Sequence, residues 1–199
     1  YDTEEKKRKI SLSTSLAFCE YNDVKINLVD MPGYFDFIGE TMEGLRAVDT
    51  AMIVVSGVSG IQVGTEKSWD YVNRGKLPRA FYVNKLDREN ADFVKTLNEL
   101  KQKFGMTVVP VQYPIGNESS FRGIVNVISG KTRIFDKKTK SMKEIDIPED
   151  MLEKVNECKN MIMEAVAETS EELLDKYFDK GTLSDEDIYT GLIDGCAKG

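Results

Sequence analysis

The pattern of apolar and polar side chains predicts strands in the first half of the chain. Apolar and polar residues alternate over residues 24–28 and the pattern turns fully apolar at Val29, as expected for a strand that enters a buried sheet. Residues 51–56 and 78–83 form two longer apolar runs. Such runs are typical of strands that are buried on both faces of a parallel sheet.

Apolar residues at helical spacing occupy the segments between and after these strands. The pattern covers residues 40–47, 64–72 and 91–104, with Thr65 expected to cap the second helix and Gly105 to end the third. Strands that alternate with helices through short connections indicate an α/β doubly wound sheet. Ligands of such sheets bind at the carboxyl ends of the strands.

The chain before the first of these strands carries weaker signals. Residues 1–9 are charged and are expected to be irregular. Hydroxyl and apolar side chains alternate over residues 10–18, which predicts a loop that becomes an edge strand. A short turn at residues 21–24 would then join this strand to the next one as a hairpin.

The pattern changes after Gly105, and we divide the chain into residues 1–105 and an α+β subdomain of residues 106–199. The expected strands of the subdomain cover residues 107–115, 123–129 and 132–135. Pro110 and Pro114 favour an edge position for the first of them. Three helices are expected to follow, over residues 148–168 and after capping-box-like openings at residues 169–172 and 184–187.

Composition and charge narrow the class of protein. The chain has 41% hydrophobic and 31% charged residues, as a soluble globular protein does, and no apolar run has the length of a membrane span. Its net charge of −7 argues against broad or sequence-specific binding to nucleic acid, because phosphate contacts need clustered Lys and Arg. The basic clusters at residues 6–9 and 137–143 are expected to be solvated loops.

The cysteines indicate a reduced, cytoplasmic setting. Cys19, Cys158 and Cys196 are odd in number and far apart, and the chain has no histidine to complete a zinc site. The chain begins at Tyr1 without a methionine and ends at Gly199 just after a helical pattern. We therefore expect it to be a piece of a longer protein.

A carboxylate and a glycine follow the first predicted buried strand, in the sequence Asp30-Met-Pro-Gly33. Pro32 fixes its own backbone, and Gly33 has no Cβ to keep a ligand away from its N–H. These groups are suited to holding the water shell of a metal ion and to donating to a terminal phosphate. Taken alone, the sequence also fits an ordinary turn.

A second polar motif, Asn84-Lys-Leu-Asp87, follows the last predicted buried strand. The carboxylate of Asp87 can accept from both N1–H and the exocyclic amine of guanine, whereas adenine would present an acceptor to it. The Asn84 amide can tie neighbouring loops, and the Lys85 stem can lie across the base. Taken alone, this motif is explained by an ordinary surface turn. Its place at the end of a predicted buried strand favours nucleotide binding. We expect Asp30 and Asp87 to meet at one edge of the sheet.

These motifs resemble signature segments of the translational GTPases. Asp30-Met-Pro-Gly33, Asn84-Lys-Leu-Asp87 and residues 8–14 look like the third, fourth and second segments of that family. The longer runs of residues 32–37, 57–64 and 84–88 resemble bacterial elongation factor G, and residues 110–116 and 121–126 resemble its inserted subdomain. The resemblance covers nearly the whole chain and implies a P-loop GTPase-type fold.

The resemblance assigns roles position by position. It implies that Ser11 and Asp30 hold Mg²⁺, with Ser11 at the position of the family's threonine and Lys9 at that of a glycine. Gly33 would donate its N–H to the γ-phosphate. Tyr34 occupies the position of the family's water-positioning histidine, so a phenol replaces an imidazole in the catalytic role. These departures point to a paralogue of the housekeeping factor.

The resemblance also implies cofactors, partners and alternatives. GTP or GDP and Mg²⁺ would bind, and the ribosome would be the partner, at the large-subunit factor-binding site and its acidic stalk protein. No Gly-x-x-x-x-Gly-Lys-Ser/Thr occurs and the family's first strand and P-loop are absent, so we expect this chain alone to be inactive while the longer protein hydrolyses GTP. A ribosome-protection or release-type factor and a non-catalytic ribosome-binding paralogue remain as alternatives.

Overall fold

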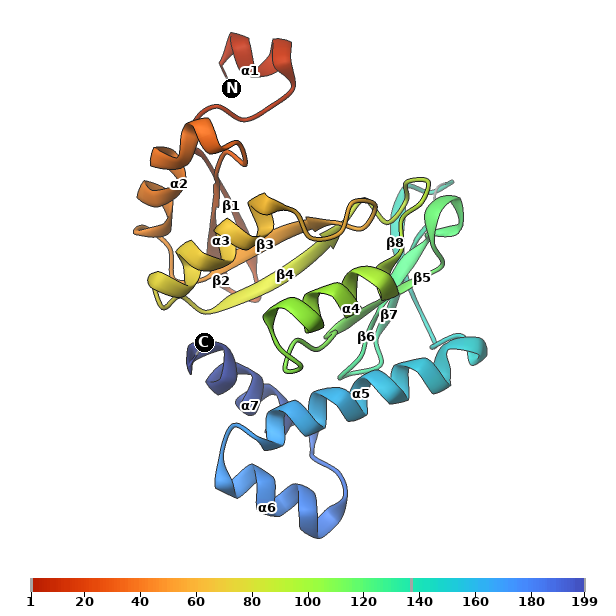
Figure 1. Cartoon of the computed structure of the whole chain (residues 1–199). Helices are drawn as coiled ribbons and strands as arrows, with labels where there is room; N and C mark the ends of the chain where they lie inside the picture. The colour runs from red at the N-terminus through yellow and green to blue at the C-terminus, as the bar shows by residue number, and fades with distance from the viewer. Residues whose placement is uncertain (1, 137, 199) are drawn as a thin grey trace. The chain divides into compact units, whose positions relative to one another are not determined.

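The computed structural model describes residues 2–136 and 138–198 (Figure 1). Tyr1, Lys137 and Gly199, which the sequence analysis placed at the chain ends and in a basic cluster, lie outside the described residues. The chain divides into two compact units. The first holds residues 2–53 and 62–80 of those described, and the second holds residues 54–61 and 81–198. Mixed α/β structure, as predicted, is present.

The first unit begins with a short helix and a hairpin. Its elements are α1 (Thr3–Arg8), β1 (Ser15–Tyr21), β2 (Val24–Asp30), the 3-10 turn η1 (Phe35–Phe37), α2 (Ile38–Leu45) and α3 (Val63–Arg74). The predicted hairpin is confirmed, with Tyr21 opposite Val24 and with Asn22 and Asp23 both at positive φ, as a tight two-residue turn requires. The prediction that residues 1–9 are irregular is wrong. Asp2 and Glu5 form a capping box that begins α1.

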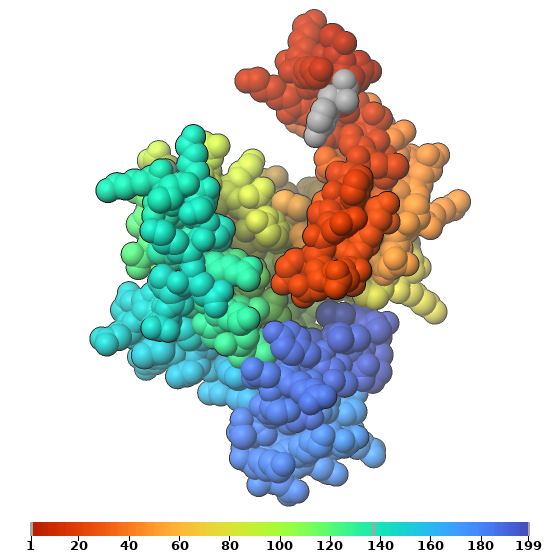
Figure 2. Space-filling view, turned by 180° about the vertical axis from the view of Figure 1, so that it is seen from behind, coloured from red at the N-terminus to blue at the C-terminus, as the bar shows by residue number. Residues whose placement is uncertain are grey.

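Two predictions about side-chain placement in this unit also fail. The strand β2 was expected to enter a buried sheet, but only Val29 in it is half-buried, because β1 is the one strand of residues 2–136 and 138–198 that pairs with it. The side chains of the hairpin are open to solvent on the face that Figure 2 shows in orange-red. Thr65 does not cap α3. Gln62 is the capping residue, and its N–H donates to the Thr65 hydroxyl at 3.3 Å.

The strands β3 (Ala51–Ser56) and β4 (Arg79–Asn84) each run from one unit into the other and pair with each other. The N–H of Ala51 donates to the Pro78 carbonyl at 2.9 Å, and the N–H of Gly57 donates to the Asn84 carbonyl at 2.8 Å. The first bond joins the starts of the two strands and the second joins their ends, so the strands are parallel, as predicted.

Burial of β3 and β4 on both faces, which their apolar runs predicted, is not observed. In β3, Ala51, Ile53 and Val55 are buried while Met52 and Val54 are 65% and 59% exposed. In β4, Tyr82 is 50% exposed. The alternation arises because the described residues cover only one face of the pair.

The second unit is built on an antiparallel sheet and helices. Its elements are α4 (Phe93–Phe104), β5 (Gln112–Ile115), η2 (Glu118–Ser120), β6 (Gly123–Asn126), β7 (Thr132–Asp136), β8 (Ser141–Ile145), η3 (Glu149–Met151), α5 (Leu152–Ala167), α6 (Glu171–Lys180) and α7 (Asp185–Lys198). The strand order is β5-β6-β7-β8, so β5 lies at the edge as its prolines predicted. Gly105 ends α4 at φ 119, which confirms the predicted stop.

Some elements of this unit were predicted only in part. The first two strands are shorter than predicted, and β8 was missed because every one of its residues is exposed and lacks apolar alternation. The cap of α6 is Ser170, one residue after the predicted start of its opening. The hydroxyl of Ser184 accepts from the N–H of Asp187 at 3.1 Å, which confirms the predicted opening of α7.

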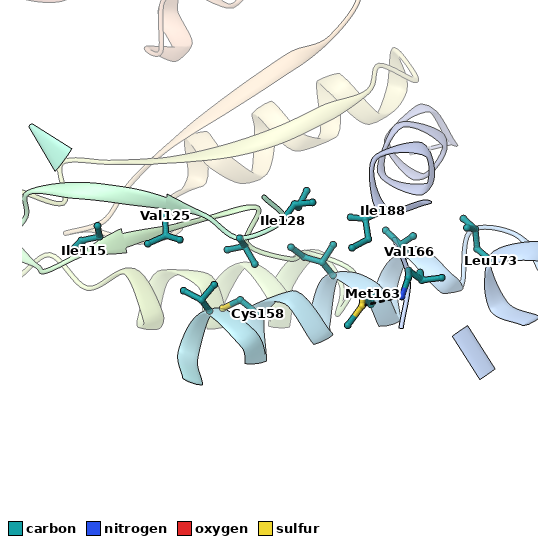
Figure 3. Close-up of a cluster of buried hydrophobic side chains, with 12 residues drawn as sticks. Ile115, Val125, Ile128, Cys158, Met163, Val166, Leu173 and Ile188 are labelled. Carbon is teal, nitrogen blue, oxygen red and sulfur yellow. Dashed lines mark hydrogen bonds between the residues drawn. The ribbon is translucent and has the colours of Figure 1, made fainter. Parts of the chain in front are cut away.

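The core of the second unit lies between the sheet and the helices α5, α6 and α7 (Figure 3). Its buried members include Val125, Cys158, Ile162, Val166 and Ile188. Burial raises the pKa of the Cys158 thiol, which suits a cysteine that packs as an apolar side chain. No helix of the described part of the chain is long and apolar enough to cross a membrane.

Candidate functional site

The predicted guanine-reading motif lies in the loop of residues 84–92, which begins where β4 ends. We call this segment the guanine-reading loop. The side chains of Asn84, Lys85 and Asp87 are all exposed. The side-chain oxygen of Asn84 accepts from the N–H of Lys85 at 2.8 Å, and Lys85 adopts a left-handed φ of 63°. A non-glycine residue in this region is uncommon, so the start of the loop has a defined and strained shape.

Gly57 fixes both ends of this loop. Its N–H donates to the Asn84 carbonyl at 2.8 Å, and its carbonyl accepts from the N–H of Asp92 at 2.9 Å. A Cβ at Gly57 would lie 2.8 Å from Cδ2 of Leu86 and 3.3 Å from the Asn84 oxygen. A side chain at this position would therefore require the Leu86 side chain to move and the Asn84 carbonyl to shift by a few tenths of an ångström, which glycine avoids. This role of Gly57 was not predicted, although the residue directly follows β3.

The predicted phosphate side of the site lies at the end of β2, in the first unit. Asp30 is exposed and pairs with Ser15 in the hairpin register. The turn after it is tied to α2, because the hydroxyl of Thr41 donates to the Pro32 carbonyl at 3.1 Å. Gly33 is exposed, and a Cβ there would meet nothing within 4 Å. Packing within the described residues therefore does not require a glycine at this position, which leaves room beside its N–H for a ligand.

Tyr34 precedes η1 and is 57% exposed. Its backbone is extended, with φ −83° and ψ 139°. The next residue, Phe35, is held by the ammonium of Lys67, which lies 4.1 Å from the centre of its ring. The backbone on the carboxyl side of Tyr34 is held by a turn, because the N–H of Phe37 donates to the Tyr34 carbonyl at 3.1 Å.

Ser11 is half-buried in the loop between α1 and β1. The carboxylate of Glu5, which is 6% exposed, holds this loop by accepting from the N–H groups of Leu12 at 2.8 Å and Ser13 at 3.2 Å. These bonds, and a third from the N–H of Asp2, lower the pKa of Glu5. Sequence reasoning missed Glu5, whose only signal was its capping-box spacing from Asp2.

Glu40 at the start of α2 ties the same loop from the other side. Its carboxylate accepts from the N–H of Thr14 at 2.7 Å. Thr41 holds the turn after Asp30, so two adjacent residues of α2 tie down that turn and the loop that carries Ser11. The predicted ligand Ser11 lies four residues before Ser15, the partner of Asp30 in the hairpin.

The predicted residues fall into two groups. Ser11, Asp30, Gly33 and Tyr34 belong to the first unit, whereas Asn84, Lys85 and Asp87 belong to the second. Each group is assembled locally by the contacts above. The meeting of Asp30 with Asp87 at one edge stays a prediction.

The donor groups on the phosphate side fit Mg²⁺ better than a metal enclosed by protein ligands. Across residues 2–136 and 138–198 no group of three or more His, Cys, Asp or Glu side chains is placed to hold a metal ion. One carboxylate and one hydroxyl are what Mg²⁺ uses when it keeps several waters and binds substrate phosphates. Asp30 and Ser11 are of these types.

An α/β chain with these two loops has the features of a guanine-nucleotide-binding domain. The family model described as the elongation factor Tu GTP binding domain matches residues 1–182 of the 199. The chain therefore belongs to this family of translational GTP-binding domains.

A solved structure agrees with this result. The crystal structure of a protein from Thermus thermophilus is similar to this chain, with a TM-score of 0.90 and 30% sequence identity. The similarity covers 100% of this chain and 30% of that protein, so the chain spans less than a third of its length. The predicted translational GTPase class is thus confirmed, and the elongation factor G assignment stays a prediction.

Proposed function

We propose that the chain is part of the GTP-binding domain of an elongation factor G-like translation factor. That factor hydrolyses GTP on the ribosome, in the cytoplasm, to drive translocation or a related step. The observation that carries this proposal is the loop after β4, whose backbone is fixed at both ends by Gly57 while Asn84, Lys85 and Asp87 stay exposed. A rigid backbone with open polar side chains is what selective reading of a base requires.

In this proposal each residue has a separate task. Asp87 accepts from two donors of guanine, Asn84 and Lys85 support the base, and Gly33 donates its N–H to the γ-phosphate. Asp30 and Ser11 hold Mg²⁺, which neutralises phosphate charge when it is bound. Tyr34 orients the attacking water by hydrogen bonding, since a phenol is both a donor and an acceptor of hydrogen bonds but a poor general base.

The proposed partner is the ribosome, at the large-subunit factor-binding site and its stalk protein. A non-catalytic ribosome-binding paralogue is the second candidate, because Tyr34 stands where the family has histidine. Exposed Asn84 and Asp87 count against it, since a scaffold has no use for base-reading side chains. A ribosome-protection or release-type role differs only in the step that hydrolysis drives.

Nucleotide selectivity tests the proposal. The longer protein that contains this chain should bind fluorescent GDP with micromolar or tighter affinity, and Asp87→Asn should shift its preference from GDP towards XDP. The amide can accept from N1–H and donate to the C2 carbonyl of xanthine, whereas the carboxylate would face that carbonyl unpaired. Discrimination should change by about two powers of ten.

The controls separate the parts of the proposal. ADP should bind neither protein, and ribosome-stimulated release of phosphate from GTP should separate an enzyme from a non-catalytic paralogue. The 199-residue chain alone should bind GDP weakly, because it lacks the P-loop sequence. Micromolar affinity of that chain would contradict this part, and a longer protein indifferent to guanine would refute the proposal.

A further inference from the structure

The turn that joins β5 to β6 carries a strained glutamate, Glu118. Its backbone has a φ of 49°, in the left-handed region that is uncommon for glutamate. The turn holds this shape through its own bonds, since the N–H of Asn117 donates to the Ser120 hydroxyl at 3.0 Å and the N–H of Ser120 donates to the Asn117 carbonyl at 2.9 Å. Strain that the surroundings maintain in this way is a mark of functional positions.

Glu118 makes two hydrogen bonds to the guanine-reading loop. Its N–H donates to the Leu86 carbonyl at 2.8 Å, and its carboxylate accepts from the N–H of Asn90 at 2.7 Å. Leu86 stands directly between Lys85 and Asp87 in the chain. Glu118 therefore holds the middle of the loop, and Gly57 holds its two ends.

The two Glu118 contacts also act on the shape of the loop. Two residues of the loop have a left-handed φ of 63°. They are Lys85, at the start of the loop, and Asn90, which contacts the Glu118 carboxylate. A loop with two left-handed non-glycine residues would relax if its anchors were removed. The carboxylate–amide bond to Asn90 is the anchor that a side-chain substitution can remove, whereas the bond to Leu86 is made by the backbone of Glu118.

We propose that Glu118 is a positioning residue that sets the guanine selectivity of the Asn84–Asp87 motif in the guanine-reading loop. A carboxylate discriminates between bases by two simultaneous hydrogen bonds only when its backbone is held within a fraction of an ångström. Loosening the loop should therefore weaken the binding of a base that makes both hydrogen bonds more than the binding of a base that makes only one. This inference rests on the proposed function and adds a residue of the α+β segment to the reading of the base.

The experiment compares GDP with IDP, which lacks the exocyclic amine, in the longer protein. Glu118→Ala should lower the ratio of the two affinities by roughly tenfold, because it removes the bond from the Asn90 N–H and lets the loop that carries Asp87 relax. Glu118→Gln keeps a carbonyl oxygen for the Asn90 N–H and should keep most of the parental ratio. Glu153→Ala, which removes an exposed glutamate of α5, is the matched control and should leave the ratio unchanged.

A second measurement does not depend on nucleotide. Amide hydrogen exchange at Asn90 in the nucleotide-free longer protein should speed up by roughly tenfold in Glu118→Ala and stay near the parental rate in Glu118→Gln. Equal losses of GDP and IDP affinity, or unchanged ratios and exchange rates, would overturn the positioning role while leaving guanine reading intact. A parent protein without preference for GDP over IDP would overturn both the proposed function and this inference.

Discussion

At the scale of single residues, the site combines side chains that face solvent with backbones that are held in place. Tyr34, which is proposed to orient the attacking water, is exposed on an extended backbone. Gly33 beside it has open space where a Cβ would be. A water and a phosphate can thus approach the same turn from solvent.

The Tyr34 phenol should matter for hydrolysis. Tyr34→Phe removes the hydroxyl that orients water and should lower ribosome-stimulated GTP turnover by about tenfold, the worth of one hydrogen bond. Tyr34→His restores a group that can also accept a proton and should raise turnover above that of the parent. Phosphate release at saturating ribosomes measures both, with Tyr21→Phe on the exposed β1 strand as the control. Unchanged turnover in both variants would remove Tyr34 from the mechanism.

At the scale of elements, local pattern predicted where strands and helices lie but not what covers them. The apolar run of β3 gave its bounds, yet burial on both faces depends on neighbours that the run does not specify, and Met52 and Val54 are exposed. The helix α1 and the strand β8 carry no apolar periodicity and were missed.

The candidate site divides in the same way. The positions of Asp30 at the end of β2 and of Asn84 at the end of β4 could be predicted, because local pattern marks where a strand ends. The roles of Asp30 and Asp87 stay predictions. The residues that hold the loops could not be predicted, because Glu118 lies 28 positions from Asn90, and Glu40 lies 26 positions from Thr14. A contact between distant residues leaves no trace in local pattern.

Gly57→Ala tests how the turn after β3 supports the loop after β4. The added Cβ would crowd Leu86 and the Asn84 oxygen, so we expect a loss of about 1–3 kcal/mol in the free energy of unfolding. Guanine nucleotide affinity should fall as well, because the loop must shift. Urea unfolding and fluorescent GDP titration measure the two effects.

Gly64→Ala is the matched control for this variant. A Cβ at Gly64 in α3 meets nothing within 4 Å, so alanine there should be neutral or stabilise by up to about 1 kcal/mol. Equal behaviour of the two alanine variants would show that the close approach at Gly57 is not important for stability.

At the scale of the whole molecule, the free energy of unfolding should fall at low pH, because carboxylates in both units are stabilised in their charged form. The Lys143 ammonium, 2.6 Å away, and backbone N–H groups hold the pKa of Asp136 at about 2. The Ser184 hydroxyl and Lys176 hold the pKa of Asp187 at about 2 as well. In the first unit, backbone N–H groups lower the pKa of Glu5.

The direction of the pH effect follows from the sign of these shifts. A folded-state pKa below the unfolded value of 3.8 for Asp means that the stabilising contribution is complete above about pH 5 and is lost as the pH falls towards 2. The free energy of unfolding should therefore be level from pH 7 to about pH 5 and then fall. Urea unfolding followed by circular dichroism at several pH values measures it.

The double variant Asp136→Asn, Asp187→Asn should have a lower free energy of unfolding at pH 7 and should lose less of it on acidification. High salt should reduce the difference, because these ion pairs are partly exposed and are therefore screened. A parental stability that stays level down to about pH 2 would contradict the assignment of these three carboxylates as stabilising anions.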